Sequence, residues 1–164
     1  MTGLPEGVRE LDHTADAGIE LVAPDLETLF DRAARALRVL AVEERPDVAG
    51  LEATPEHATP ETPAGESSAE ARGANATTYM LELEARDAGA LLVRWLSELL
   101  YRIDTLGLAY EGAEIEVRDR RLHARIRETP LPVPGAQIKA ITYHGLECGP
   151  RSDGRWAARV IFDV

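Results

Sequence analysis

The chain has 164 residues, of which 45% are apolar and only 5% aromatic, and its formal net charge is -11. This length suits a single domain, 1–164, with a core built mostly from aliphatic side chains. No apolar run approaches the roughly 20 residues that span a bilayer, and the N-terminal residues lack a signal-peptide pattern. We therefore expect a cytoplasmic protein with no membrane partner, and the negative charge disfavours non-specific attraction to nucleic acid.

The first predicted elements are a strand and a helix. Apolar residues alternate from Ala17 to Leu21, as in a strand with one buried face. Asp25 is a suitable N-cap for the helix that follows. That helix has apolar residues at spacings of three and four, which predict one buried stripe: Leu26, Leu29, Phe30, Ala33, Ala34, Leu37 and Leu40.

The segment 46–75 interrupts this pattern. It contains seven Ala, four Pro and six acidic residues, with Val48 and Leu51 as its only large aliphatic residues. Such a composition buries too little apolar surface to offset the conformational entropy lost on ordering. We expect a disordered acidic insertion within the single domain.

A second strand and helix follow the insertion. Alternation from Tyr79 to Ala85 predicts the strand, and Asp87 is the expected N-cap of the helix. The inward stripe of this helix is predicted to contain Leu91, Leu92, Trp95, Leu96, Leu99 and Ile103.

The rest of the chain favours strands. Segments 113–117 and 122–126 are joined by a tight Asp119-Arg120 turn, and a strand at 137–147 leads through Asp153-Gly154 to the last strand. These elements predict an α+β fold, a two-layer sandwich in which two helices cover one face of a mixed β-sheet. The two rounds of strand and helix also suggest an internal duplication.

A cation site is one interpretation of the polar residues near the two ends of the chain. Asp12-His13-Thr14-Ala15-Asp16 places two carboxylates, an imidazole and a hydroxyl within five residues, although such residues also cap turns. The last residues, Asp163 and Val164, end an apolar β-rich segment that we expect to lie in a sheet. Asp16 and Asp163 could together bind a hard cation. Oxygen donors favour Ca²⁺ or Mg²⁺ over Zn²⁺, and His13 would also suit Mn²⁺.

Segment 138–144 is a strand with chemically distinctive side chains. Lys139 lies on one face and His144 on the other. A lone strand histidine is usually structural, but His13 and His144 could also meet across a sheet around a cation. The chain has no Gly-rich phosphate loop, nucleophile elbow, His-Glu-x-x-His or paired Cys-x-x-Cys, so we predict no nucleophile and base.

Two other groups of side chains have simple interpretations. Cys148, the only cysteine, fits a reducing compartment and is interpreted as a small packed or idle thiol. Five arginines surround the Asp119-Arg120 turn and could contact phosphates, but strand alternation favours a solvated arginine face: Arg118, Arg120, Arg121, Arg125 and Arg127.

The chain resembles the archease family at several segments. The most specific are His13-Thr14-Ala15-Asp16, Lys139-Ala140-Ile141-Thr142-Tyr143-His144 and the terminal Phe162-Asp163-Val164. Further similarity occurs at 25–30, 91–100 and 154–156. The resemblance covers most of the chain outside 46–75, and that acidic insertion is the departure from the family pattern.

The resemblance implies a non-catalytic, metal-binding cofactor of the GTP-dependent RNA ligase of the RtcB type. Such a ligase seals tRNA halves and other RNA ends, and the cofactor promotes its guanylylation and repeated turnover. Contact with RNA is then indirect, through the ligase. The implied metal ligands are Asp16, Asp163 and the main-chain oxygens of Val164, with Ca²⁺ the expected ion. His13, Lys139 and His144 match family positions as supporting residues.

The residues also leave two other functions open. A divalent-metal-dependent hydrolase or phosphotransferase would use Asp16, Asp163 and His144 as ligands and base. A general chaperone or protein-interaction module would use the acidic, partly disordered surface.

Overall fold

The computed structural model describes residues 3–12, 17–42, 76–132 and 136–164. The strands are β1 (Val8–Asp12), β2 (Ala17–Ala23), β3 (Thr77–Glu84), β4 (Leu108–Arg118), β5 (Arg121–Pro130), β6 (Ala140–Pro150) and β7 (Trp156–Asp163). The helices are α1 (Leu26–Val42) and α2 (Ala88–Tyr101), which continues into a π-helical turn, η1 (Arg102–Leu106). No helix in these ranges is long and apolar enough to cross a membrane. The predicted insertion at 46–75 lies outside the described residues.

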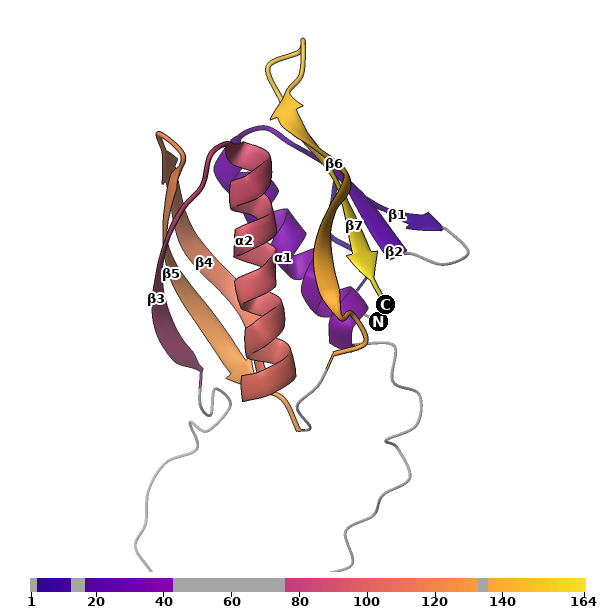
Figure 1. Ribbon diagram of the computed structural model, residues 1–164. Helices are drawn as coiled ribbons and strands as arrows, with labels where there is room; N and C mark the ends of the chain where they lie inside the picture. The colour runs from indigo at the N-terminus through magenta and orange to yellow at the C-terminus, as the bar shows by residue number, and fades with distance from the viewer. Residues whose placement is uncertain (1–2, 13–16, 43–75, 133–135) are drawn as a thin grey trace, which may run out of the picture.

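The strands form two antiparallel sheets. One has the order β1-β2-β7-β6 and the other the order β3-β5-β4. The two helices lie between the sheets (Figure 1), where α1 contacts β2 and β4 while α2 contacts β6 and β3. The predicted α+β sandwich is confirmed.

The division of the strands differs from the single mixed sheet expected from the sequence. Alternation identifies which side chains of a strand face the core, but it does not specify which strands pair. Each helix packs against both sheets instead of covering one face of one sheet. The suggested internal duplication stays a prediction.

Both predicted N-caps are confirmed. The Thr28 backbone N–H donates to Asp25 Oδ1 at 2.7 Å, and the Ala90 N–H donates to Asp87 Oδ1 at 2.8 Å. Hydrogen bonding from Thr28 stabilises the charged carboxylate and therefore lowers the pKa of Asp25. Each cap satisfies a backbone donor that has no partner within its own helix.

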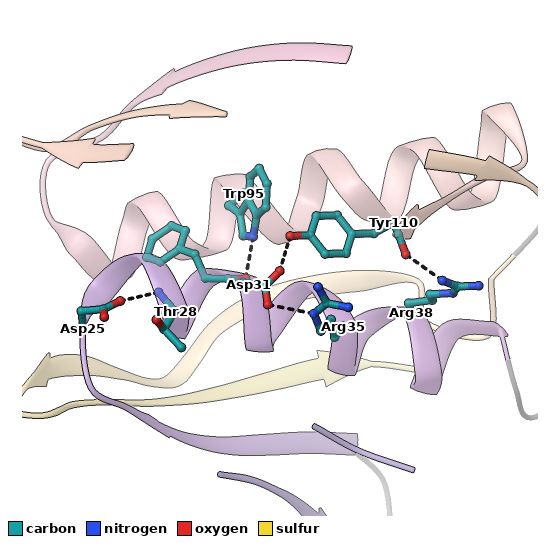
Figure 2. A network of polar contacts seen from close by, with 8 residues as sticks. Asp25, Thr28, Asp31, Arg35, Arg38, Trp95 and Tyr110 are labelled. Carbon is teal, nitrogen blue, oxygen red and sulfur yellow. Dashed lines mark hydrogen bonds and ion pairs between the residues drawn. The ribbon is translucent and has the colours of Figure 1, made fainter. Parts of the chain in front are cut away.

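Three aromatic residues, Phe30, Trp95 and Tyr110, gather where the helices meet β4. The Trp95 ring lies 6.4 Å from that of Phe30 and 6.0 Å from that of Tyr110, with an edge-on arrangement toward the latter. Trp95 Nε1 donates to the main-chain oxygen of Phe30 at 3.0 Å, and the Tyr110 hydroxyl donates to Asp31 Oδ1 at 2.6 Å (Figure 2). Buried aromatic polar groups thus have partners, and these contacts join α1, α2 and β4.

The β4–β5 hairpin has the predicted two-residue turn. Asp119 and Arg120 both have positive φ, 48° and 67°, as type I′ turns require. At the other end of the hairpin the register shifts between Tyr110 and Gly112. This β-bulge was not evident in the sequence, because alternation on either side of it looks regular.

A buried ion pair fixes the end of α2 to the β3-β5-β4 sheet. The Arg102 guanidinium donates to both carboxylate oxygens of Glu128, one of them at 2.6 Å, and stacks 3.8 Å above the Tyr79 ring. Arg102 is 9% exposed and Glu128 is fully buried. The hydrogen bond to Glu128 raises the pKa of Arg102, which keeps the guanidinium charged.

Candidate functional site

The end of β7 carries the two described residues of the predicted cation site. Asp163 is the last residue of β7 and is exposed, and Val164 beyond it is 47% exposed. The main-chain oxygen of Asp163 accepts a hydrogen bond from the Lys139 N–H at 2.7 Å. Ala140, the first residue of β6, is the register partner of Asp163. The beginning of β6 and the end of β7 therefore lie side by side.

The other neighbour of β7 leads to the first predicted motif. Ala17, the first residue of β2, is paired with Phe162. Asp16 immediately precedes Ala17 in the sequence, but Asp16 and His13 lie outside the described residues. Ala17, which follows Asp16 in the sequence, thus lies at the same end of the β1-β2-β7-β6 sheet as Asp163 and Lys139.

The described residues do not by themselves complete a metal site. No group of three or more His, Cys, Asp or Glu side chains in the described ranges is arranged to hold an ion. This result does not test the predicted set, because one of its two carboxylates, Asp16, is not among the residues searched.

His144 is placed apart from the end of β7. Four residues of β6, 143–146, lie between the pairs Thr142–Ile161 and Glu147–Arg159, where β7 contributes only Val160. His144 belongs to this irregular segment and is exposed. Bulges commonly redirect side chains in this way. The suggested partner of His144, His13, lies outside the described residues, so the pair of histidines stays a prediction.

A cavity beside Lys139 is a feature that the sequence did not reveal. It has a volume of about 450 Å³ and lies between the end of α2, η1 and the beginning of β6. Leu100, Ile138 and Ile141 contribute apolar side chains, while Tyr101 and Asp104 line it from α2 and η1. The apolar stripe of α2 was predicted, but the π-helical turn that ends it has no recognised sequence signal.

Cys148 behaves as the sequence indicated. It is a free thiol of intermediate burial, and this burial raises its pKa to about 11. A thiol that stays protonated near neutral pH is a poor nucleophile and a poor metal ligand. We find no role for Cys148 in the site.

The arginines around the β4–β5 turn are all exposed, as expected for a solvated face: Arg118, Arg120, Arg121, Arg125 and Arg127. Arg118 pairs with Glu116 and Arg121 with Glu84. Exposed pairs of this kind contribute little to stability.

Comparison with known proteins identifies related chains. A sequence model described as the Archease protein family (MTH1598/TM1083) matches residues 9–62 and 65–164. Protein archease of Pyrococcus furiosus is 26% identical over 161 residues, which cover 93% of this chain and 95% of the relative. Protein archease of Methanopyrus kandleri is 27% identical over 163 residues, covering 94% and 97% respectively.

Solved structures show the same fold. The solution structure of Methanobacterium thermoautotrophicum protein 1598 is 28% identical, with a TM-score of 0.59, and the match covers 98% of this chain and 100% of that one. The crystal structure of a Thermotoga maritima archease, described as a possible chaperone, is 21% identical with a TM-score of 0.52 over 95% and 96% of the two chains.

Proposed function

The chain belongs to the archease family, and from this membership we propose that it is a non-catalytic, cation-binding cofactor of an RtcB-type GTP-dependent RNA ligase. The observation that carries the proposal is the convergence at one end of a sheet. Ala17, which follows Asp16 in the sequence, lies on β2, Asp163 ends β7, and Lys139 immediately precedes β6 and is hydrogen-bonded to Asp163. The family match includes all of these positions.

The proposed ligands are the carboxylates of Asp16 and Asp163 and the main-chain oxygens of Val164. The exposure of Asp163 and Val164 supports this assignment, because an ion can reach them without unfolding the sheet. A donor set made only of oxygen suits a hard cation, with Ca²⁺ first and Mg²⁺ or Mn²⁺ as alternatives. When bound, the cation supplies positive charge to an otherwise acidic end of the sheet.

Lys139 is the proposed contact for the partner ligase. Its backbone is fixed by the hydrogen bond to Asp163, while its side chain is exposed and has no carboxylate partner within the described part of the chain. The exposed ammonium group is available to an acidic or phosphate group of the ligase. His13 and His144 are supporting positions, with His144 exposed on β6.

The experiment that tests the proposal measures RNA joining with the protein and the ligase separately and together. RNA with 3′-phosphate or 2′,3′-cyclic phosphate ends is incubated with GTP, divalent cations and a limiting amount of ligase. Faster turnover only when both proteins are present supports the cofactor function. Reaction of the RNA or GTP with this protein alone would indicate a hydrolase or phosphotransferase instead. No effect on the ligase, combined with suppressed aggregation of unrelated proteins, would indicate a chaperone.

A further inference from the structure

The outer face of the β3-β5-β4 sheet carries basic residues that differ in their partners. Near the hairpin turn, Arg121 lies 3.2 Å from Glu84, and His123 lies 3.9 Å from Glu82. Farther along β5, the side chains of Arg125 and Arg127 have no ion pair or hydrogen bond within the described ranges. Two guanidinium groups on one strand are therefore available to an external anion.

The bulge in β4 gives Arg127 an unusual neighbour. It places Gly112 opposite Arg127 in the register. A side-chain carbon added to Gly112 would lie 2.9 Å from Arg127 Nη2 and 3.3 Å from Arg35 Nη2. Guanidinium groups from β5 and α1 thus approach the same point, above a backbone that has no side chain of its own.

The α1 side of this point is held by a polar network. Arg35 Nε donates to Asp31 Oδ2 at 2.8 Å, and Asp31 also accepts from the buried Tyr110 hydroxyl (Figure 2). Arg38 donates to the main-chain oxygen of Tyr110 at 3.0 Å. Arg35 is therefore positioned before any ligand arrives, which reduces the entropy cost of binding.

The acidic residues around Gly112 limit which anions Arg35 and Arg127 can bind. Glu114 is the register partner of Arg125, and Glu111 pairs with Arg38. Nearer the turn, Glu82 and Glu116 flank β5 on both sides. A polyanion laid along the whole strand would meet all of these carboxylates, whereas a single anionic group beside Arg125 and Arg127 would face only Glu114.

A small cavity lies beside the unpaired arginines. It has a volume of about 270 Å³ and is lined by Thr78, Ala113, Glu114, Arg125 and Arg127. A hydroxyl and two guanidinium groups offer several donors to one tetrahedral oxyanion. Arginine forks match phosphate oxygens bidentately.

We propose that Arg35, Arg125 and Arg127 form a phosphate-binding site at the β4 bulge. The ligand is one phosphate group, carried either by an RNA strand or by a nucleotide. RNA and GTP are chosen as test ligands because of the proposed function, whereas the site is inferred only from the positions of these three side chains. It lies on the other sheet from Asp163, so the two sites can be measured independently.

Binding is measured by NMR titration and calorimetry with three ligands: inorganic phosphate, GTP and a short single-stranded RNA. We expect the parent to bind at least one of them at low salt, with shifts centred on Gly112 and Arg127. The double variant Arg125→Ala/Arg127→Ala should reduce affinity at least about tenfold. If RNA is the ligand, the slope of log affinity against log salt concentration should become shallower by about 0.7, the contribution of one neutralised phosphate in a single strand.

Three further variants separate a local site from general surface charge. Gly112→Ala keeps the net charge but places a methyl group against both guanidinium groups, and should weaken binding. Glu114→Gln removes a carboxylate from the cavity and should strengthen it. Arg121→Ala, on the same face of β5 but paired with Glu84, is the matched control and should bind like the parent.

The proposal is overturned if none of the three ligands binds the parent, or if the double variant binds as well as the parent. An equal loss in Arg121→Ala would also overturn it, because the effect would then reflect diffuse charge. Unchanged circular dichroism and melting temperature establish that the variants are folded. The double variant should bind cations like the parent. A negative result for phosphate binding therefore leaves the proposed ligase function untouched, and the reverse also holds.

Discussion

Asp163 combines two roles at the end of β7. Its main-chain oxygen accepts the hydrogen bond from Lys139, which belongs to the sheet, while its carboxylate is exposed. A change confined to the carboxylate therefore leaves the backbone pairing in place. The role proposed for this side chain can be tested without unfolding the protein.

Asp163→Asn should lower the affinity for Ca²⁺ by about tenfold or more, or about 1.4 kcal/mol, because it removes one formal charge from the proposed ligand set with almost no change in shape. Calorimetric titration of the metal-free protein measures the effect. Asp119→Asn is a suitable control, since it removes an equal charge at a turn residue with positive φ, where Asn is well tolerated. Equal affinity in the parent and Asp163→Asn would eliminate Asp163 as a ligand.

Cys148 allows a test of burial by pH. Its pKa is raised from 9.0 to about 11 by burial, so the thiolate fraction at pH 8 should be about 100-fold lower than that of an ordinary thiol. Alkylation of the native protein should be correspondingly slow and should accelerate as the pH rises toward 11. The urea-unfolded chain provides the reference rate. Equal rates in the two states would show that the thiol is not protected.

At the scale of elements, the Arg102–Glu128 pair joins η1 to β5. Glu128→Ala should reduce the free energy of unfolding by about 3 kcal/mol, because a buried guanidinium loses the carboxylate to which it donates and keeps only Glu98, at 3.9 Å. Glu84→Ala, which removes the partner of the exposed Arg121, should cost less than about 1 kcal/mol. Urea denaturation measures the free energy of unfolding of both variants. Equal decreases would contradict the difference in burial between the two ion pairs.

Elements with a local signal were predictable from the sequence. The N-caps at Asp25 and Asp87 and the Asp119-Arg120 turn depend on residues within a few positions, and all three are confirmed. The β4 bulge, the irregular segment 143–146 and the Arg102–Glu128 pair depend on partners distant in sequence. No periodicity in one segment can reveal such partners.

At the scale of the whole molecule, two sheets enclose two helices (Figure 1). The sheet that contains both β2 and β7 draws together segments from near the two ends of the chain. The candidate site could be predicted from family motifs, but its position at a sheet end required the strand order. The sequence indicated Arg125 and Arg127 as possible phosphate contacts, but the approach of Arg35 to Gly112 could not be predicted, because Arg35 lies on α1, far away in the sequence.

The segment 46–75 offers a test of domain organisation. We expect its replacement by a flexible Gly/Ser linker to leave cooperative thermal unfolding nearly unchanged, because its composition provides few residues for a core. Differential scanning calorimetry measures the transition. A lost or much broader transition would show that the segment belongs to the folded domain.

We propose that this protein stimulates a partner ligase through the end of the β1-β2-β7-β6 sheet that carries the proposed cation ligands. The most direct measurement is the multiple-turnover rate of RNA joining by a limiting RtcB-type ligase, with the parent protein and with Asp163→Asn. We predict that the parent increases the rate several-fold and that Asp163→Asn does not, although both have the same melting temperature without metal. Equal stimulation by the two proteins, or no stimulation by either, would contradict the account.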